Sequence, residues 1–161
     1  MLLRHAVPAD IPAIAALEAV CFPPAEAASE ASIRDRVMAW GDHFWLLTDD
    51  HGRILSFING PVVKAEHLAD EMFADASCHD PNGDWLMIFG VDTDPAYRRQ
   101  GLASRVMHQV IADARSAHLK GIVLTAKEQL VPWYAGFGYA DEGVCASQHG
   151  GAVWHEMRLT L

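Results

Sequence analysis

The chain has 161 residues, of which 51% are hydrophobic and 20% charged. That balance is typical of a globular domain with a buried core and excludes a disordered chain. Acidic residues outnumber basic ones by 21 to 12, for a formal charge of −9, which argues against a nucleic-acid partner and is compatible with a cationic small substrate.

The three cysteines, Cys21, Cys78 and Cys145, form no C-x-x-C pair. An odd number of distant cysteines favours free thiols in a reducing compartment over a disulfide framework or a zinc site. No apolar run has the length of a leader or a membrane span. We therefore expect a single domain over residues 1–161, located in the cytoplasm, with no metal and no membrane partner.

The first 40 residues predict one strand and two helices. The apolar run over residues 2–7 suits a first strand, and Asp10 is placed to cap the helix that follows. That helix carries its apolar residues on one face and ends before Pro23. A second helix is predicted over residues 29–40, beginning at Ser29.

The middle of the chain predicts a hairpin and a central strand. Residues 43–63 contain two β-rich runs separated by Asp50-His51-Gly52, a typical turn. Residues 64–84 are polar and rich in turn formers, with room for one short helix. Residues 85–91 are apolar at every position, which indicates a central strand covered on both faces.

The last third predicts a long helix, two strands and a short helix. From Leu102 onward, apolar residues recur every four positions, as on a helix buried along one stripe. Residues 121–126 predict a strand, 129–139 a short helix ended by glycines, and 151–161 a last strand. Together these elements predict a mixed α/β domain with helices against both faces of one sheet.

The stretch VDTDPAYRRQGLASRV (91–106) joins the central strand to the long helix. The first amides of a helix have no partner within it, and the helix dipole is positive there. Gly101 and Ala103 keep this corner free of bulky side chains, and Arg98 and Arg99 add positive charge. The corner therefore suits a phosphate or pyrophosphate, although the same residues also suit an ordinary helix start with two solvated arginines.

Neither a P-loop pattern nor G-x-G-x-x-G is present. Instead, Arg98-x-x-Gly101-x-Ala103 resembles the coenzyme A loop of the GNAT acetyltransferase superfamily, and LVPWYAGFGY (130–139) resembles its second signature. Four further segments resemble, in order, the arylalkylamine (serotonin-type) N-acetyltransferases, with the first closer to their microbial branch: CFPPAEAAS (21–29), GRILSFINGP (52–61), DPNGDWLMIFGV (80–91) and GVCASQHGGAVWHEMRLTL (143–161).

This resemblance implies the GNAT fold, an α/β fold with a mixed, mostly antiparallel central sheet and helices on both faces. It also implies that acetyl-CoA is held in a cleft splayed between the two central strands. The pantetheine arm would pair with the backbone of Val91, Asp92 and Thr93. The pyrophosphate would lie on the loop and first helical turn formed by Arg98, Arg99, Gln100, Gly101, Leu102, Ala103 and Ser104.

The resemblance places Tyr134 beside the thioester sulfur, and Phe22, His149 and Trp154 in the amine pocket. A phenol with a pKa near 10 is protonated at neutral pH, so Tyr134 is expected to donate a proton to the leaving thiolate. Its alternative role is that of a core aromatic residue. His149 is either a pocket residue that titrates near neutrality or a solvent-exposed turn residue.

The sequence departs from the family at the base. Vertebrate relatives carry two histidines on the central strand, and the aligned positions here are Met87 and Phe89. Neither can accept a proton. Asp84, at the start of that strand, is expected to be a solvated turn residue. We therefore expect the reaction to depend on the free-base fraction of the amine, unless His149 supplies the base.

The expected function is direct transfer of an acetyl group from acetyl-CoA to a small primary amine, arylalkylamine or polyamine-like, by a monomer or homodimer. Two alternatives stay open. The chain could be a catalytically weak, CoA-binding sensor or interaction module, or it could acetylate a protein amine.

Overall fold

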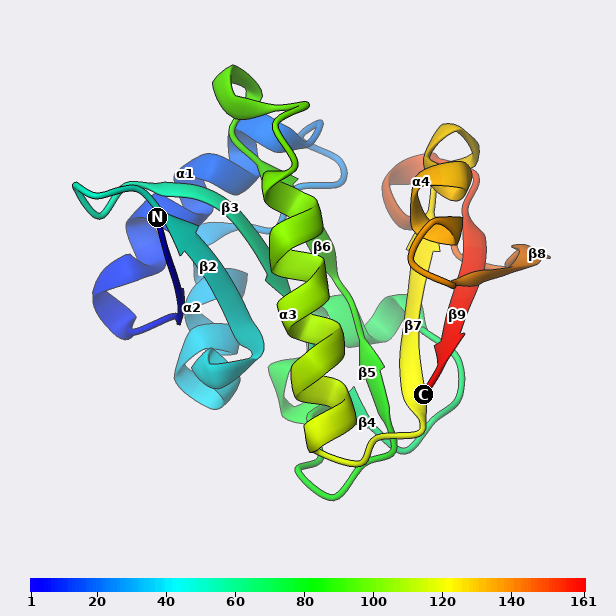
Figure 1. The fold of residues 1–161 in the computed structure, drawn as a ribbon. Coiled ribbons are helices and arrows are strands. Elements are labelled where there is room, and N and C mark those ends of the chain that lie inside the picture. Colours follow the sequence, from blue (N-terminus) through cyan, green and yellow to red (C-terminus); the bar gives the residue numbers. More distant parts are fainter.

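The computed structural model describes residues 1–161 and contains two sheets and four α-helices (Figure 1). The first sheet is antiparallel throughout and has the order β1 (Leu2–His5), β2 (Phe44–Thr48), β3 (Ile54–Asn59) and β6 (Gly90–Thr93). The second sheet has the order β4 (Val62–Val63), β5 (Trp85–Met87), β7 (Gly121–Ala126), β9 (His155–Thr160) and β8 (Ala140–Val144). Only the β5–β7 pair is parallel.

The predicted α/β fold with a mixed, mostly antiparallel sheet is confirmed, and the sheet is divided in two because the central strand changes partner in its middle. The Ile88 amide donates to the Val123 carbonyl on β7 at 2.9 Å, whereas the next amide, Phe89, donates to Asn59 on β3 at 2.8 Å. The neighbouring hairpin strand breaks at the same level: the Gly60 Cα lies so close to the Met87 carbonyl that any side chain there would collide with it. Two adjacent strands thus break together, and the two halves belong to different sheets.

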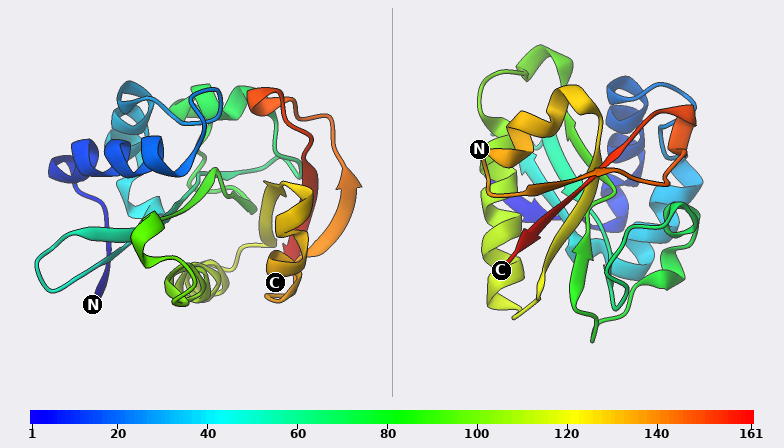
Figure 2. Two further views of the ribbon diagram at one scale, coloured as in Figure 1. Left: turned by 90° about the horizontal axis from the view of Figure 1, so that it is seen from above. Right: turned by 90° about the vertical axis from the view of Figure 1, so that its right-hand side faces the viewer.

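The helices cover both faces, as predicted (Figure 2). Helices α1 (Ile11–Cys21) and α2 (Glu30–Trp40) pack on one face of the first sheet around a core that includes Trp40, Phe44 and Phe57. Helix α3 (Leu102–Ser116) covers the other face, where its buried stripe joins a core of 20 residues that also receives α4 (Val131–Ala135). No helix combines the length and the apolar character that a membrane crossing needs.

Several local predictions need correction. Asp10 precedes α1 but does not cap it, because its carboxylate binds Arg4 at 2.8 Å and the Val7 amide at 2.9 Å. Residues 64–84 contain two short 3-10 helices, Asp70–Ala74 and Ala76–Cys78, and no α-helix. The last strand begins at His155 rather than at residue 151, and β8 was not predicted, because Ala140–Val144 is largely exposed and lacks a β-like apolar pattern.

Other local predictions are confirmed. The hairpin of β2 and β3 turns at Gly52, whose φ of +81° favours glycine. The carboxylate of Asp49 stabilises this turn by accepting the His51 and Arg53 amides. Ser29 caps α2, since its Oγ accepts the Ser32 amide at 3.1 Å.

Candidate active site

A cleft with a volume of about 730 Å³ lies where the two sheets separate. Strands β5 and β7 pair in parallel as far as Met87 and Val123, after which β6 and β7 diverge towards the start of α3 (Figure 1). Strand β6 is bonded to β3 on one side and has no strand partner on the other. The walls of the cleft come from both diverging strands, with α1, α4 and the start of α3 around them.

One end of the cleft is built from the backbone at the start of α3. The first hydrogen bond of the helix joins the Arg105 amide to the Gly101 carbonyl at 3.1 Å, so the amides of residues 102–104 precede it. Gly101 has a φ of +78°, and a side chain added there would meet no atom within 4 Å. The glycine is therefore needed for its left-handed backbone, and the space beside it is open to a ligand.

Positive side chains surround this open space. Arg98 and Arg99 are both exposed and line the cleft, and the Arg98 Nε donates to the Thr93 carbonyl at 3.3 Å. Arg99 also has a positive φ of 62°, which is uncommon for a residue with a side chain. Unpaired amides, a helix dipole and two guanidinium groups make this end a site for an anion.

The expected cofactor residues fall into two groups. Val91, Thr93, Arg98, Arg99, Gly101, Leu102, Ala103 and Ser104 line the cleft. Gln100 and Asp92 do not. The Asp92 carbonyl accepts the Ser56 Oγ of β3 at 2.7 Å, and its carboxyl group is fully buried. The side chain of Asp92 therefore belongs to the interior beside the cleft.

Tyr134 lies in the wall of the cleft opposite β6. Helix α4, which begins at Val131 and carries Pro132 in its first turn, positions it, and the ring packs edge-on against Trp133 and Tyr139. The side chain is buried, with 7% of the residue exposed. Burial raises the pKa of Tyr134 far above its usual value, and the Asp92 carboxylate raises it further. The phenol is consequently a protonated donor at any physiological pH.

The other end of the cleft is lined by aromatic side chains. Phe22, His149 and Trp154 all lie there. The His149 ring stacks on Phe73 with centroids 4.4 Å apart, and its Nε2 lies 3.0 Å from the Glu26 carbonyl. Trp154 Nε1 donates to the His149 carbonyl at 2.8 Å. His149 is therefore a half-buried, packed residue and not the solvated turn residue of the alternative prediction.

Sequence reasoning missed an ion pair at this end. The Glu26 carboxylate and the Lys127 ammonium group are 2.8 Å apart and line the cleft. Lys127 also lies 5.6 Å from the ring centroid of Trp154. The two charged residues are 101 positions apart in the chain, so no local pattern could have paired them.

A second missed acid is Glu18, which reaches the cleft from α1. Phe89 lies nearby in the cleft wall, with its ring tilted against that of Phe73 at a centroid distance of 4.7 Å and the Arg36 guanidinium group 4.7 Å from its centroid. Met87 is completely buried. Asp84 lies outside the cleft and forms an ion pair with Lys120 at 3.5 Å. Neither family histidine position therefore carries a proton acceptor, and Asp84 is remote from the cleft.

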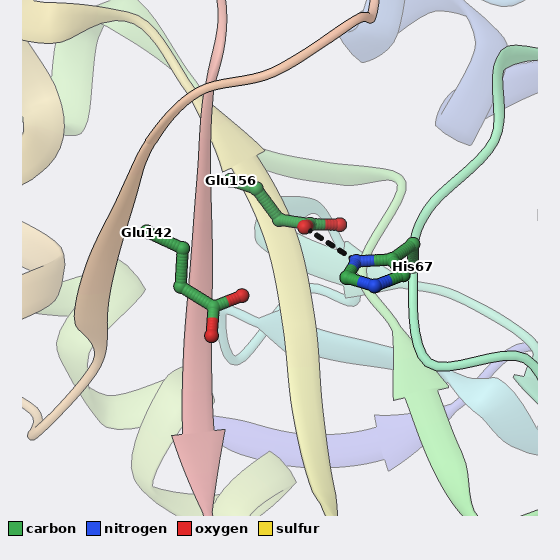
Figure 3. Close-up of side chains that lie close together, drawn as sticks. All are labelled: His67, Glu142 and Glu156. Carbon is green, nitrogen blue, oxygen red and sulfur yellow. Dashed lines mark hydrogen bonds and ion pairs between the residues drawn. The ribbon is translucent and has the colours of Figure 1, made fainter.

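A group of potential metal ligands consists of Glu142 on β8, Glu156 on β9 and His67 on the loop after β4 (Figure 3). Glu156 is bonded to His67 at 2.7 Å and to the Leu68 amide at 3.2 Å. Glu142 is paired with the guanidinium group of Arg158 at 3.1 Å. Since an arginine already supplies positive charge to this group, the ligand set does not favour a metal ion.

A sequence model of the acetyltransferase (GNAT) family matches residues 11–139. The serotonin N-acetyltransferase of Mesocricetus auratus is 26% identical over 113 residues, which cover 70% of this chain and 53% of the relative. The match thus spans about half the length of that relative.

Solved structures resemble the whole chain. The loading GNATL domain of CurA from Lyngbya majuscula has a TM-score of 0.85 at 14% identity, over 99% of this chain and 96% of that one. The GNAT-like decarboxylase GphF in complex with isobutyryl-CoA has a TM-score of 0.81 at 22% identity, over 99% of both chains. At these identities the likeness shows the fold.

Proposed function

Because the chain belongs to the acetyltransferase (GNAT) family, we propose that it transfers the acetyl group of acetyl-CoA directly to a small primary amine bound in the same cleft. The observation that supports this proposal is that the two ends of the cleft suit ligand groups of opposite charge. One end offers free amides and two arginines to an anion, and the other offers carboxylates and aromatic rings. The buried phenol of Tyr134, on α4, lines the same cleft.

The residues at the anion end fit the cofactor. The amides of residues 102–104 would hold the pyrophosphate, with Arg98 and Arg99 beside it, and the unpaired edge of β6 at Val91 and Thr93 would hold the pantetheine arm. The open space at Gly101 leaves room for the phosphate groups. When bound, acetyl-CoA supplies an activated acetyl group as a thioester and leaves as the thiolate.

The residues at the other end favour an aromatic or alkyl amine. Phe22, Phe73 and Trp154 provide apolar and π surface, and the Glu18 and Glu26 carboxylates provide negative charge for an ammonium group. This combination suits an arylalkylamine, with a polyamine as the alternative. Lys127 neutralises Glu26 directly, which leaves Glu18 as the unpaired acid of the cleft.

Tyr134 is assigned as the proton donor. Its hydroxyl stays protonated because burial disfavours the phenolate. A thiolate leaving from the cleft would take this proton, and the phenol would regain one from the nitrogen that has formed the new bond. Edge-on packing against Trp133 and Tyr139 holds its ring in place.

The proposal is tested by measuring thiol release with acetyl-CoA as the donor against a panel of arylalkylamines, alkylamines, polyamines and peptide N-termini. We expect turnover with a small amine and little with peptides. Turnover of peptides alone would make the chain a protein-amine acetyltransferase. Acetyl-CoA binding in calorimetry without turnover of any amine would identify it as a binding module.

A further inference from the structure

We propose that Glu18 accepts the proton of the substrate amine and that Asp92, directly behind it, is the positioning residue that makes Glu18 an effective base. This inference rests on the proposed function. It supplies the proton acceptor that Met87 and Phe89 do not provide. It stands on the convergence of two buried carboxyl groups beneath Gly90, in the floor of the cleft.

Glu18 is held in place by one oxygen and free at the other. Its Oε2 accepts the Ala28 amide at 2.9 Å. Its Oε1 lies 3.7 Å from the point where a side chain on Gly90 would begin. Only 6% of the residue is exposed, yet both Glu18 and Gly90 line the cleft. Because Gly90 has no side chain, no side-chain atom of this residue separates the carboxylate from the cleft.

Asp92 approaches the same point from β6. Its Oδ1 lies 3.1 Å from the position of that absent Gly90 side chain, and the whole residue is buried. Neither carboxyl oxygen has a hydrogen-bond donor from the rest of the chain. A buried acid without a donor keeps its own proton and needs an acceptor, and the Glu18 carboxylate is the neighbouring acceptor.

The pKa of Asp92 agrees with this geometry. Burial raises it well above the usual value, and the negative charge of Glu18 nearby raises it further. Once Asp92 has lost its proton, two carboxylates lie near each other in a buried site, and such a site takes up a proton readily, which is the property required of a base.

Charged and titratable groups from several elements surround the two acids. Arg36 on α2 donates to the Asn59 Oδ1 at 3.2 Å and to the Phe73 carbonyl at 2.9 Å. Its positive charge attracts both carboxylates, although it bonds to neither, and is therefore compatible with negative charge on the two acids. Cys21 on α1 also acts on Asp92, and Asp92 acts on Tyr134 of α4. Two further groups act one step away, Arg98 on Cys21 and Cys78 on Arg36.

The proton balance is complete without an additional reactant. The N–H bond of the ammonium group breaks and its proton moves to Glu18, which leaves a neutral amine. The amine nitrogen then forms the bond to the acetyl carbon as the carbon–sulfur bond breaks. The thiolate takes a proton from Tyr134, Tyr134 regains one from the amide nitrogen, and Glu18 returns its proton to water.

Two other groups in the cleft are weaker candidates. The Glu26 carboxylate is paired with the Lys127 ammonium group at 2.8 Å. His149 is stacked on Phe73, and its Nε2 lies 3.0 Å from the Glu26 carbonyl, so it donates there and cannot accept through that nitrogen. Glu18 alone combines a place in the cleft with an oxygen free of a cationic partner.

The experiment compares Glu18→Gln and Asp92→Asn with the wild type, using Glu26→Gln as the cleft control and Asp84→Asn as the surface control. The readouts are kcat/KM against pH for two amines of different pKa, and acetyl-CoA affinity by calorimetry. Infrared difference spectroscopy of the free protein adds a readout independent of turnover, because a protonated carboxyl group at neutral pH has its own C=O stretch. Circular dichroism verifies the fold of each variant.

We expect the wild-type profile to rise with pH at a position that is the same for both amines. Glu18→Gln should lower kcat/KM by at least about a hundredfold with acetyl-CoA affinity unchanged. Asp92→Asn should lower kcat, move the rise to lower pH and remove the protonated-carboxyl band. Asp84→Asn should match the wild type throughout. Glu26→Gln alters the amine end and should change KM, but it should keep the band and the pH at which the rise occurs.

A rise that moves with the pKa of the amine, or one removed by Glu26→Gln instead, overturns the proposal. So does a wild-type protein without the protonated-carboxyl band. A wild type that acetylates no amine defeats the proposed function and the base with it, whereas an active wild type matched by Glu18→Gln defeats only the base.

Discussion

The two ends of the cleft are built in different ways. The anion end is formed by consecutive residues, uses mainly backbone amides and is exposed. The amine end gathers side chains from α1 and the loop after it, from Lys127 just after β7 and from the 149–154 segment, and its ion pair joins residues 101 positions apart. At the first end, the local chain conformation creates the site. At the second, the site exists only after the two sheets have come together.

This difference has a consequence for substitutions. A change at the anion end acts on backbone geometry and charge, and leaves the core intact. A change at the amine end removes one partner of a buried pair, so it alters both binding and stability. Substitutions at the anion end should therefore change mainly ligand affinity, whereas those at the amine end should also change stability.

Gly101→Asp should weaken acetyl-CoA binding by at least about a thousandfold, roughly 4 kcal/mol. The new carboxylate would enter the open space at Gly101 and repel the pyrophosphate. Gly101→Asn is the matched control, because asparagine tolerates a left-handed backbone and carries no charge. Calorimetry separates the two effects: equal losses in both variants would mean that backbone strain, and not charge, causes the loss.

Tyr134→Phe should lower kcat between about tenfold and a thousandfold, with acetyl-CoA affinity nearly unchanged. The variant keeps the ring packed against Trp133 and Tyr139 and removes only the proton donor. Steady-state kinetics at saturating amine measures the effect. Tyr97→Phe, which alters a tyrosine at the other wall of the cleft, is the control, and full turnover by Tyr134→Phe would show that water protonates the thiolate.

Lys127→Met should destabilise the protein by about 1–3 kcal/mol, because it leaves a buried carboxylate without its partner. The Glu26 side chain is only 5% exposed, against 32% for Lys127. Adding Glu26→Gln should recover most of the loss, and chemical denaturation of both single variants and the double variant completes the cycle. Additive losses would mean that the two residues do not interact energetically.

Asp92→Asn should make the melting temperature less dependent on pH, by a few degrees. The folded state raises the pKa of Asp92 above its usual value of 3.8, so the unfolded chain loses this proton first. Wild-type stability therefore falls as the pH rises from about 4 through the folded-state pKa, and this fall is absent in the variant. Calorimetry at pH 5 and pH 8 tests it, with Asp84→Asn as a control that should follow the wild type.

The sequence alone determined much of the fold. The spacing of apolar residues, together with capping and turn-forming residues, located α2 with its Ser29 cap, the β2–β3 hairpin and the buried stripe of α3. Each of these features depends on residues that are neighbours in the sequence. The same is true of the loop before α3, where Gly101 and the two arginines are consecutive in the chain. Resemblance to the family added Tyr134, Phe22, His149 and Trp154, all of which lie in the cleft.

The position at which the central strand breaks and the proximity of two buried acids depend on the tertiary structure. Residues 85–91 are uniformly apolar, so nothing in them predicted that Ile88 and Phe89 bond to different sheets; that break follows from the close contact of Gly60 with Met87. Glu18 and Asp92 are ordinary acids in the sequence. Their meeting beneath Gly90 depends on α1 packing against β6, because burial and charge coupling arise from three-dimensional contacts that no local pattern records.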